Sequence, residues 1–583
     1  MKMRVRIVNG IVIFIFLFIA LNILNIEVIQ GRKFRILSNQ NCIRLIPQKG
    51  SRGNILDRRG NIIVDNNLSY NVMVSSSGNS GIDKTLLGTA RILNTNFKDL
   101  KDTFRHKYTA SFMPTTIAKN IDVKKAIALE ELKPDLDNIM IQPYPLRSYP
   151  YGRLACHVLG YLNEIDLWRL TKLANYGYKT KDIVGFGGVE EKYDYFLRQE
   201  AGGLSVEVDH RGRLVTVLGF KPPRNGKDIE LTIDLKIQKI AEESLRGRNG
   251  SVILMDPHSG EIIAMTNNPN FDPSAFVKKS DASISNLFAD LDAPFINRAI
   301  TGVYPAGSVF KLVVATAALE TGRINSSTAF TCTGSTYVGR QKFSCWDTHN
   351  QQNLTAAITN SCNVFFYRSG LLVGASAIYD YATQFGFSHS TSIDLPYEAA
   401  GFVPSPLLRK IYGFSRYSGI PLLAGKNWFD GDTANFAIGQ GELLVTPIQV
   451  IRMMAVFANR GTLVTPYIIK TIDGENIVNL KRSAVRLSLK ESTISYIRQG
   501  LRGVVADPKG TANALSSLPI SVAGKTGTAQ VSRGQPHGWF AGFFPYQSPK
   551  FVICVFLEHG GSGHAASIVA KQIIESMIKE GLI

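Results

Sequence analysis

The sequence predicts an α+β protein that is held in a membrane by one N-terminal transmembrane helix. Three observations support this fold class. An uncharged, mostly apolar stretch lies close to the N-terminus, turn-rich β elements follow it, and strands flank long apolar helices in the C-terminal part. With 583 residues the chain is too long for one hydrophobic core, so at least two domains are expected outside the membrane.

The first predicted element is a transmembrane helix over residues 7–26, which follows a short tail of residues 1–6. The stretch is long enough to cross a hydrocarbon core of about 30 Å. Lysine and arginine in the tail favour a cytoplasmic N-terminus. No small-x-small cleavage site follows Leu24, so an uncleaved signal anchor is favoured over a cleaved signal peptide. No second segment is comparably long and apolar, and the remaining chain is therefore expected outside the cytoplasmic membrane.

Residues 27–227 are expected to form a β-rich domain without catalytic residues. Residues 52–64 are typical of it, because a glycine turn is followed there by a short apolar run. Such turn-rich β elements with local charge pairing favour a structural role. A segment rich in proline and glycine, residues 222–226, marks the boundary, and the next domain is expected to span residues 228–583.

The C-terminal domain is expected to contain a central antiparallel sheet covered by helices. The apolar run 251–255 can pair with residues 261–265 across a turn, which is a hairpin pattern. Residues 520–531 and 537–543 give a second hairpin. Long apolar helices, such as the one that contains residues 312–319, would cover the sheet.

The formal net charge of +19 raises the question of a nucleic-acid partner. Lysine and arginine are scattered along the chain, and no nucleic-acid-binding motif is present. We therefore expect no nucleic acid to bind. A basic surface that faces anionic lipid or an anionic polymer is the simpler explanation of the charge.

The first of three short motifs is Ser308-Val309-Phe310-Lys311, which follows a Pro/Gly turn and opens a predicted helix. Residues three apart share a helix face, so Lys311 can reach the hydroxyl of Ser308. The helix N-terminus would also favour developing negative charge near the serine. Taken alone, the motif could equally be the start of an amphipathic helix with an exposed lysine.

The second motif is Ser361-x-Asn363, and the third is the run Lys525-Thr526-Gly527. The third motif lies on a predicted strand whose small residues would let a substrate backbone lie close. Each motif is weak by itself. Their order is typical of a serine acyl-transfer site in which lysine activates the nucleophile.

This set of motifs resembles the class B penicillin-binding proteins, which are peptidoglycan D,D-transpeptidases, and most closely the penicillin-binding protein 2 family. The resemblance implies that residues 27–227 form the pedestal, or dimerisation-like, domain, which docks proteins of the wall machinery. It implies that residues 228–583 form a penicillin-binding, β-lactamase-like transpeptidase domain. The implied function is crosslinking of the wall during cell elongation, inhibited by β-lactams.

The resemblance also implies roles for the motif residues. Ser308 would attack the penultimate D-alanine of a donor stem peptide, and a neutral Lys311 would accept its proton. Ser361 would relay the proton to the leaving D-alanine, and Asn363 would orient Lys311 and the substrate amide. For Lys311 to be neutral, either nearby positive charge, which Lys525 could supply, or desolvation must lower the pKa of Lys311.

The residues around the third motif would bind the substrate. Thr526 and Thr528 would hold its terminal carboxylate, and Gly527 would let its backbone approach. The backbone N–H groups of Ser308 and Thr528 would bind the oxyanion. An amine of a second stem peptide would then attack the acyl-enzyme and close the crosslink.

Other functions stay open from the sequence. A septal class B transpeptidase is the closest, and a D,D-carboxypeptidase would pass the acyl group to water. A β-lactamase would need a deacylating base, and no glutamate can be assigned to that role. Outside the enzymes, a β-lactam sensor or a wall scaffold would bind without turnover.

The expected partners are peptidoglycan stem peptides, β-lactams, a SEDS-type membrane glycosyltransferase and wall-elongation proteins. The expected location is the cytoplasmic (inner) membrane, crossed once, with the catalytic domain on the periplasmic side. These expectations follow from the resemblance together with the predicted anchor.

Cys332, Cys345, His349 and Cys362 have the spacing C-x12-C-x3-H-x12-C, which provides a full tetrahedral N/S ligand set for zinc. This resembles the zinc site of some penicillin-binding protein 2 family members, and others use aspartates there, so Asp347 is a candidate substitute. The metal would brace the loop of the second motif, and the chemistry itself would need no cofactor. A Cys332–Cys345 disulfide, favoured by an oxidising compartment, or free thiols are the alternatives.

Overall fold

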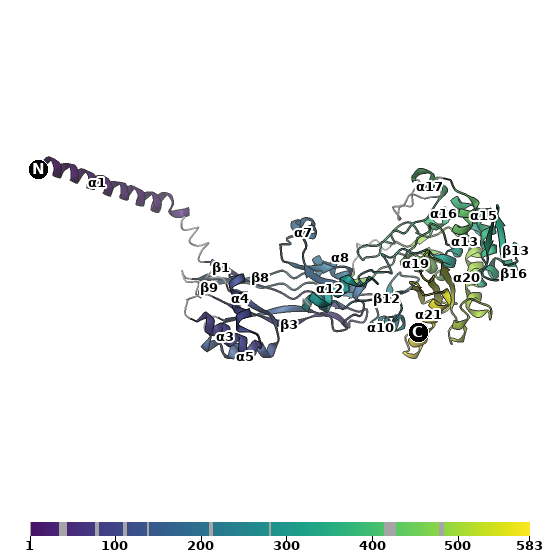
Figure 1. The fold of residues 1–583 in the computed structure, drawn as a ribbon, viewed down its shortest axis with the longest axis horizontal. Coiled ribbons are helices and arrows are strands. Elements are labelled where there is room, and N and C mark those ends of the chain that lie inside the picture. Colours follow the sequence, from purple (N-terminus) through teal and green to yellow (C-terminus); the bar gives the residue numbers. More distant parts are fainter. Residues whose placement is uncertain are drawn as a thin grey trace. The chain divides into compact units, whose positions relative to one another are not determined.

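The computed structural model describes residues 2–33, 43–75, 81–108, 114–136, 139–208, 214–278, 281–412, 427–476 and 483–583 (Figure 1). Helices and strands are mixed along the chain, and a five-stranded antiparallel sheet, whose strands are almost wholly buried, has helices packed on it. The α+β fold class predicted from the sequence is therefore confirmed.

The chain begins with helix α1, Lys2–Leu24, which continues as a π-helical turn over Asn25–Ile29. The mean hydropathy between Arg6 and Ile29 is 2.8, and no part of this segment is buried by protein. Within the described part of the chain, this is the one helix that is long and apolar enough to cross a membrane. It fits the single-pass anchor expected from the sequence.

The chain divides into two compact units that alternate along the sequence. The first comprises Met1–Gly53, Asn66–Arg147 and Arg198–Gly226. The second comprises Asn54–Asp65, Ser148–Leu197 and Lys227–Ile583. Both units draw on the expected pedestal segment, and the domain bounds 27–227 and 228–583 stay a prediction.

The first unit contains an antiparallel sheet and a separate helical core. The sheet has the order β1-β8-β9, with strands Ile43–Gln48, Gly202–Val208 and Leu214–Lys221. The core lies between α3 (Ile82–Leu93), α4 (Phe97–Lys107), α5 (Val123–Glu131), β4 (Thr115–Ile121), β5 (Ile139–Ser148) and the end of β3 (Ile62–Val74). Leu86 and Leu129, one from each of two helices, are fully buried in it.

The second unit is built on a five-stranded antiparallel sheet with the order β12-β11-β23-β22-β21. The strands are Ile262–Asn268, Gly250–Met255, Phe551–Leu557, His537–Phe544 and Ala523–Ala529. Nearly every residue in them is buried, because helices cover the sheet. Both hairpins expected from the sequence are present, as β11–β12 and β21–β22.

Helices pack on this sheet in two groups. The first group is α10 (Leu235–Leu245) and α21 (Gly563–Lys579), the second is α19 (Pro447–Ala458) and α20 (Glu491–Ala506), and α13 (Lys311–Glu320) packs against α20. The start of α19 is fixed by a capping box, in which the Thr446 and Gln449 side chains each accept the other residue's backbone N–H. All twelve residues of α19 are buried, as its apolar sequence predicts.

Smaller elements of the second unit fall into two groups. Beside the motifs lie β13 (Ala329–Cys332), β14 (Ser335–Val338), β15 (Gln341–Ser344), β16 (Asn350–Asn353), α14 (Leu354–Thr359), α15 (Asn363–Val373), α16 (Ala375–Gln384) and α18 (Asp430–Ala437). The second group contains β6 (Tyr161–Glu164), α7 (Leu167–Leu173), β7 (Ile183–Phe186), α8 (Gly188–Lys192) and α9 (Asp194–Leu197), and Val189 of α8 and Leu197 of α9 are buried in the main core.

Candidate active site

Ser308 lies in a short 3₁₀ turn, Gly307–Phe310, that leads directly into α13. Gly307 has a φ of +55°, and a Cβ there would lie 2.8 Å from the carbonyl oxygen of Thr528. Only glycine fits this approach without strain. The glycine therefore lets the Ser308 turn lie against strand β21, which carries the third motif.

Lys311 is fully buried at the start of α13 and connects the first motif to the second. Its Nζ donates to the carbonyl oxygen of Ser361 at 2.8 Å, to Ser361 Oγ at 3.3 Å and to Asn363 Oδ1 at 2.6 Å. Among the described residues it forms no hydrogen bond with Ser308. Burial lowers the pKa of Lys311 to about 8, although the nearby Cys345 and Cys362 act in the opposite direction.

The second motif occupies the turn between α14 and α15. Ser361 has a φ of +52°, a left-handed conformation that is unfavourable for a residue other than glycine. This turn aims both the carbonyl and the hydroxyl of Ser361 at Lys311 Nζ. Asn363 is the first residue of α15, and its Nδ2 donates to the carbonyl oxygen of Ser344 at 3.4 Å.

The third motif lies on β21, where Lys525 pairs with Ala541 and Gly527 with Trp539 of the neighbouring strand. Lys525 is fully buried, and its pKa is well below the usual value because of burial and, second, the charge of Lys311. Two buried ammonium groups that repel each other favour a state in which only one is charged. The first and third motifs are thus electrostatically coupled.

Residues next to Lys525 present hydroxyl groups. Thr526 is buried, and its Oγ1 lies 2.5 Å from the Oγ1 of Thr511. Thr528 is exposed and accepts the N–H of Gly563 at 3.1 Å. A Cβ on Gly527 would meet the Ala306 carbonyl oxygen at 3.2 Å. The strand therefore passes close to the turn that carries the first motif.

Thr511 was missed by the sequence analysis. Its hydroxyl contacts Thr526, so it can set the orientation of a side chain that is expected to bind substrate. The residue lies in the loop after α20, and its neighbour Gly510 signals only a turn. No pattern in the sequence connects that loop with β21.

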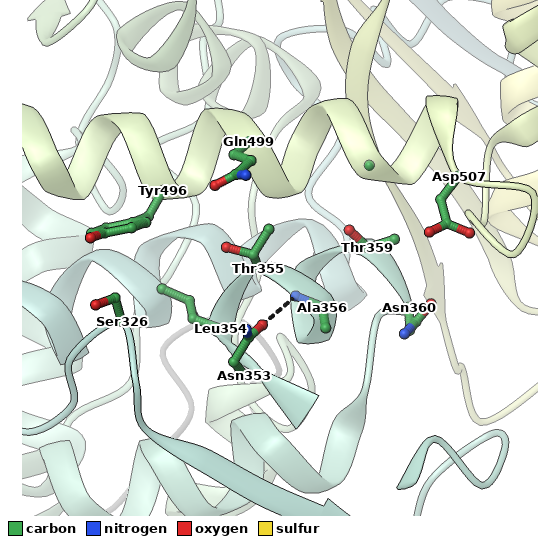
Figure 2. A pocket seen from close by; sticks show the side chains of 11 residues that line it. Ser326, Asn353, Leu354, Thr355, Ala356, Thr359, Asn360, Tyr496, Gln499 and Asp507 are labelled. Atoms are coloured by element: carbon green, nitrogen blue, oxygen red, sulfur yellow. Dashed lines mark hydrogen bonds between the residues drawn. The ribbon is translucent and has the colours of Figure 1, made fainter. Parts of the chain in front are cut away.

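A polar pocket of about 530 Å³ lies between α14 and α20, next to the second motif (Figure 2). The side chain of Asn353 caps α14 by accepting the N–H of Ala356 at 2.9 Å, a bond that is drawn in the figure. Asn360, which precedes Ser361, lines the pocket and holds Trp346 Nε1 through its carbonyl oxygen at 3.1 Å. No motif side chain lines this pocket.

The four predicted metal ligands do come together. Their ligand atoms, the three sulfurs and one imidazole nitrogen, all lie within 4.8 Å of one another. His349 Nδ1 is 3.7 Å from the sulfur of Cys332 and 3.5 Å from that of Cys345. The cysteines are free thiols in the structure, and Asp347 does not belong to the group. The cluster could hold a metal ion.

The chemistry of the cluster suits a soft divalent ion. A hydrogen bond from Cys362 lowers the pKa of the Cys345 thiol, and the same bond, together with burial, raises the pKa of Cys362. One thiolate is thus already favoured, and a metal would replace the protons of the other two thiols. Cys345 also accepts the backbone N–H of Asn363 at 3.2 Å, so the cluster contacts the second motif directly.

Comparison with known proteins agrees with this geometry. Residues 250–578 match the penicillin binding protein transpeptidase domain, and residues 47–231 match the penicillin-binding protein dimerisation domain. These matches cover most of the chain, including all three motifs. The chain therefore belongs to the penicillin-binding protein transpeptidase family, and the family predicted from the sequence is confirmed.

Relatives matched over nearly their full length, and solved structures, support the same family. The peptidoglycan D,D-transpeptidase MrdA of Salmonella typhimurium is 31% identical, over 98% of this chain and 95% of that protein. The penicillin-binding protein PBP2 of Helicobacter pylori, in its complex with MreC, has a TM-score of 0.80 at 26% identity, covering 93% of this chain and 99% of that one. PBP2 of Pseudomonas aeruginosa, in complex with WCK 5153, has a TM-score of 0.69 at 26% identity, covering 91% and 96%.

Proposed function

We propose that this chain is a peptidoglycan D,D-transpeptidase of cell-wall elongation that works through an acyl-enzyme on Ser308. The transpeptidase function predicted from the sequence is confirmed at the level of the activity, because full-length relatives carry that name. The serine mechanism and the residue roles are our proposal. The observation that carries it is the buried Lys311 Nζ, one turn from Ser308 and bonded to both polar residues of the second motif.

In the first half-reaction, Ser308 Oγ attacks the carbonyl carbon of the penultimate D-alanine, and its proton passes to neutral Lys311. The desolvation of Lys311 supports this role, since a pKa of about 8 leaves part of the lysine unprotonated near neutral pH. The backbone N–H groups of Ser308 and Thr528 bind the oxyanion. When the C–N bond breaks, Ser361 relays the proton to the leaving D-alanine.

In the second half-reaction, an amine of another stem peptide attacks the ester carbon of the acyl-enzyme. The new C–N bond forms, the bond to Ser308 Oγ breaks, and the amine proton returns to Oγ through Ser361 and Lys311. Asn363 holds Lys311 in place through the 2.6 Å bond to its Oδ1. The site formed by the three motifs would also accept a β-lactam, which would acylate Ser308.

Substrate binding itself would help to activate Lys311. The terminal carboxylate would lie against the hydroxyls of Thr526 and Thr528, beside the small Gly527, and would favour the charged form of Lys525. Because the two lysines repel each other, a charged Lys525 favours a neutral Lys311. Without substrate, burial and the charge of Lys311 lower the pKa of Lys525, so the substrate carboxylate is what would move the positive charge onto Lys525.

We infer that the cluster of Cys332, Cys345, His349 and Cys362 binds zinc. Three sulfurs and an imidazole nitrogen within 4.8 Å fit tetrahedral zinc better than a harder ion. When bound, the metal would act as a structural crosslink that braces the turn of the second motif. No step of the acyl transfer runs through it.

We also propose that residues 27–227 form the pedestal and residues 228–583 the transpeptidase domain, which the two family matches support. Helix α1 would anchor the protein in the inner membrane with both domains on the periplasmic side. The PBP2 relative from Helicobacter pylori forms a complex with MreC, which supports a wall-elongation protein as partner. A SEDS-type glycosyltransferase stays a prediction.

The decisive experiment is the intact mass of the protein before and after exposure to a β-lactam. One stable adduct is expected on the wild type and on Ser492→Ala, an exposed serine of α20, and none on Ser308→Ala. A crosslinking assay with stem-peptide substrates then separates transpeptidase from carboxypeptidase and sensor. An adduct that persists in Ser308→Ala would refute the assigned nucleophile.

A further inference from the structure

A second cavity, of about 610 Å³, lies in the second unit and is lined by none of the motif residues. Its wall carries the rings of Trp168, Tyr176, Tyr195 and Tyr397, which are between 56% and 69% exposed. Large aromatic rings in such number are unusual on a free surface. They give the cavity flat apolar faces with polar edges.

A charged network lines part of this cavity. Arg169 stacks over the ring of Phe186 at 3.8 Å and forms ion pairs with Asp166 and Glu191. Glu191 accepts the hydroxyl of Tyr397 at 2.5 Å, and Arg169 donates to the same hydroxyl at 3.2 Å. One ring of the wall is thus fixed by a charged network rather than by loose packing.

The charges that remain available at the cavity are positive. The Glu191 carboxylate accepts hydrogen bonds from Arg169 and from the Tyr397 hydroxyl. The Asp194 carboxylate accepts hydrogen bonds from the Tyr178 hydroxyl and the N–H of Gly185. Two further lysines of the wall, Lys172 and Lys192, are exposed and form no ion pair with a described residue. Lys172 lies over the ring of Trp168, with its Nζ 3.6 Å from the ring centroid.

We propose that this cavity binds a peptidoglycan glycan strand that carries carboxylate-bearing stem peptides. The apolar faces of the sugar rings would stack on the aromatic side chains, and the Tyr195 hydroxyl would bond to a sugar hydroxyl or acetamide. The two lysines would pair with peptide carboxylates. The identity of the polymer rests on the proposed function, and the site would hold the polymer whose peptides the enzyme crosslinks.

The test is co-sedimentation of the full chain, in detergent, with purified peptidoglycan, and its competition by soluble glycan strands with and without peptides. Trp168→Ala is expected to weaken binding of both kinds of strand by about 2- to 10-fold. Lys172→Glu is expected to weaken binding of the peptide-bearing strands more than that of the peptide-free ones. The matched controls, Tyr337→Ala and Lys124→Glu, change exposed residues outside the cavity and should bind normally.

Acylation of Ser308 by a β-lactam is measured on every variant, because it reports the transpeptidase pocket independently of the glycan site. Normal acylation with weakened strand binding in the cavity variants supports the proposal. Strand binding that is unchanged in both Trp168→Ala and Lys172→Glu overturns it, as does an equal loss in the control variants. If the wild type is not acylated, the proposed serine mechanism is refuted. The strand-binding measurements would still decide whether the cavity binds glycan strands.

Discussion

Lys311 is the residue whose protonation state controls the proposed chemistry. Burial lowers its pKa to about 8, so the lysine is mostly protonated, and cannot accept the proton of Ser308, in more acidic solution. The rate of acylation by a β-lactam is therefore expected to rise between about pH 6 and pH 9, with a midpoint near 8. Lys311→Ala should lower that rate by about 10²- to 10⁴-fold, measured by rapid quench and intact mass.

The lowered pKa of Lys311 also makes the folding stability depend on pH. The unfolded lysine has its usual pKa of 10.5, so between pH 8 and 10.5 the unfolded chain binds more protons at this position than the folded one. The contribution of Lys311 to folding stability then rises as the pH rises through this window.

The pH dependence of acylation tests the role of Lys311 as the base. An acylation rate that does not change with pH would contradict a neutral Lys311 in that role.

The sequence was sufficient for residues that act within one element and insufficient for contacts between elements. Ser308 and Lys311 could be predicted together, because their spacing alone puts them on one helix face. The bond from Lys311 Nζ to the carbonyl of Ser361 depends on the left-handed backbone of that serine, which no sequence pattern signals. The contact of Thr511 with Thr526 is equally invisible, because it joins a loop to a strand.

At the scale of elements, the segment between β13 and α15 is held by side chains rather than by a continuous sheet. Its strands form two separate hairpin-like pairs, β13–β16 and β14–β15. The cysteine and histidine ligands lie at the ends of these strands and at the start of α15. A metal crosslink would therefore contribute much of the order of the second motif.

Cys332→Ser is expected to lose bound zinc and to lower the melting temperature by about 3–10 °C, because one ligand of a structural site is gone. Zinc content by elemental analysis and calorimetry check this. Cys554→Ser, at a buried cysteine of β23 outside the cluster, is the control and should keep its zinc. Wild-type protein that contains no zinc and has Cys332 oxidised to Cys345 would exclude the zinc site.

Element pairing shows the same limit of the sequence. The hairpin β11–β12 was predictable, because its strands are adjacent and joined by a short turn. The parallel pairing of β2 (Ile55–Leu56) with β10 (Ile229–Leu231) was not, since these short strands are far apart in the chain. Pairings of this kind place residues 54–65 in the second unit. The domain bounds predicted from the sequence had assigned these residues to the pedestal.

At the scale of the whole molecule, the chain separates anchoring from chemistry. The three motifs and the cysteine–histidine cluster all lie within Lys227–Ile583 of the second unit, whereas α1 belongs to the first. The core beneath the motifs is continuous from the sheet through α13 and α19, and none of the α1 side chains that the structure describes contributes to it. The acylating site should therefore form without the anchor.

A chain that lacks residues 1–29 is expected to stay in solution without detergent and to be acylated by a β-lactam at the rate of the full chain. The reason is that the deleted segment is apolar, unburied and outside every described contact of the three motifs. Vesicle flotation and labelling with a fluorescent penicillin measure the two properties, with Ser308→Ala in the shortened chain as the control. Loss of labelling in a shortened chain that still melts cooperatively would show that the anchor is needed to form the pocket, and the separation of anchoring from chemistry would then be wrong.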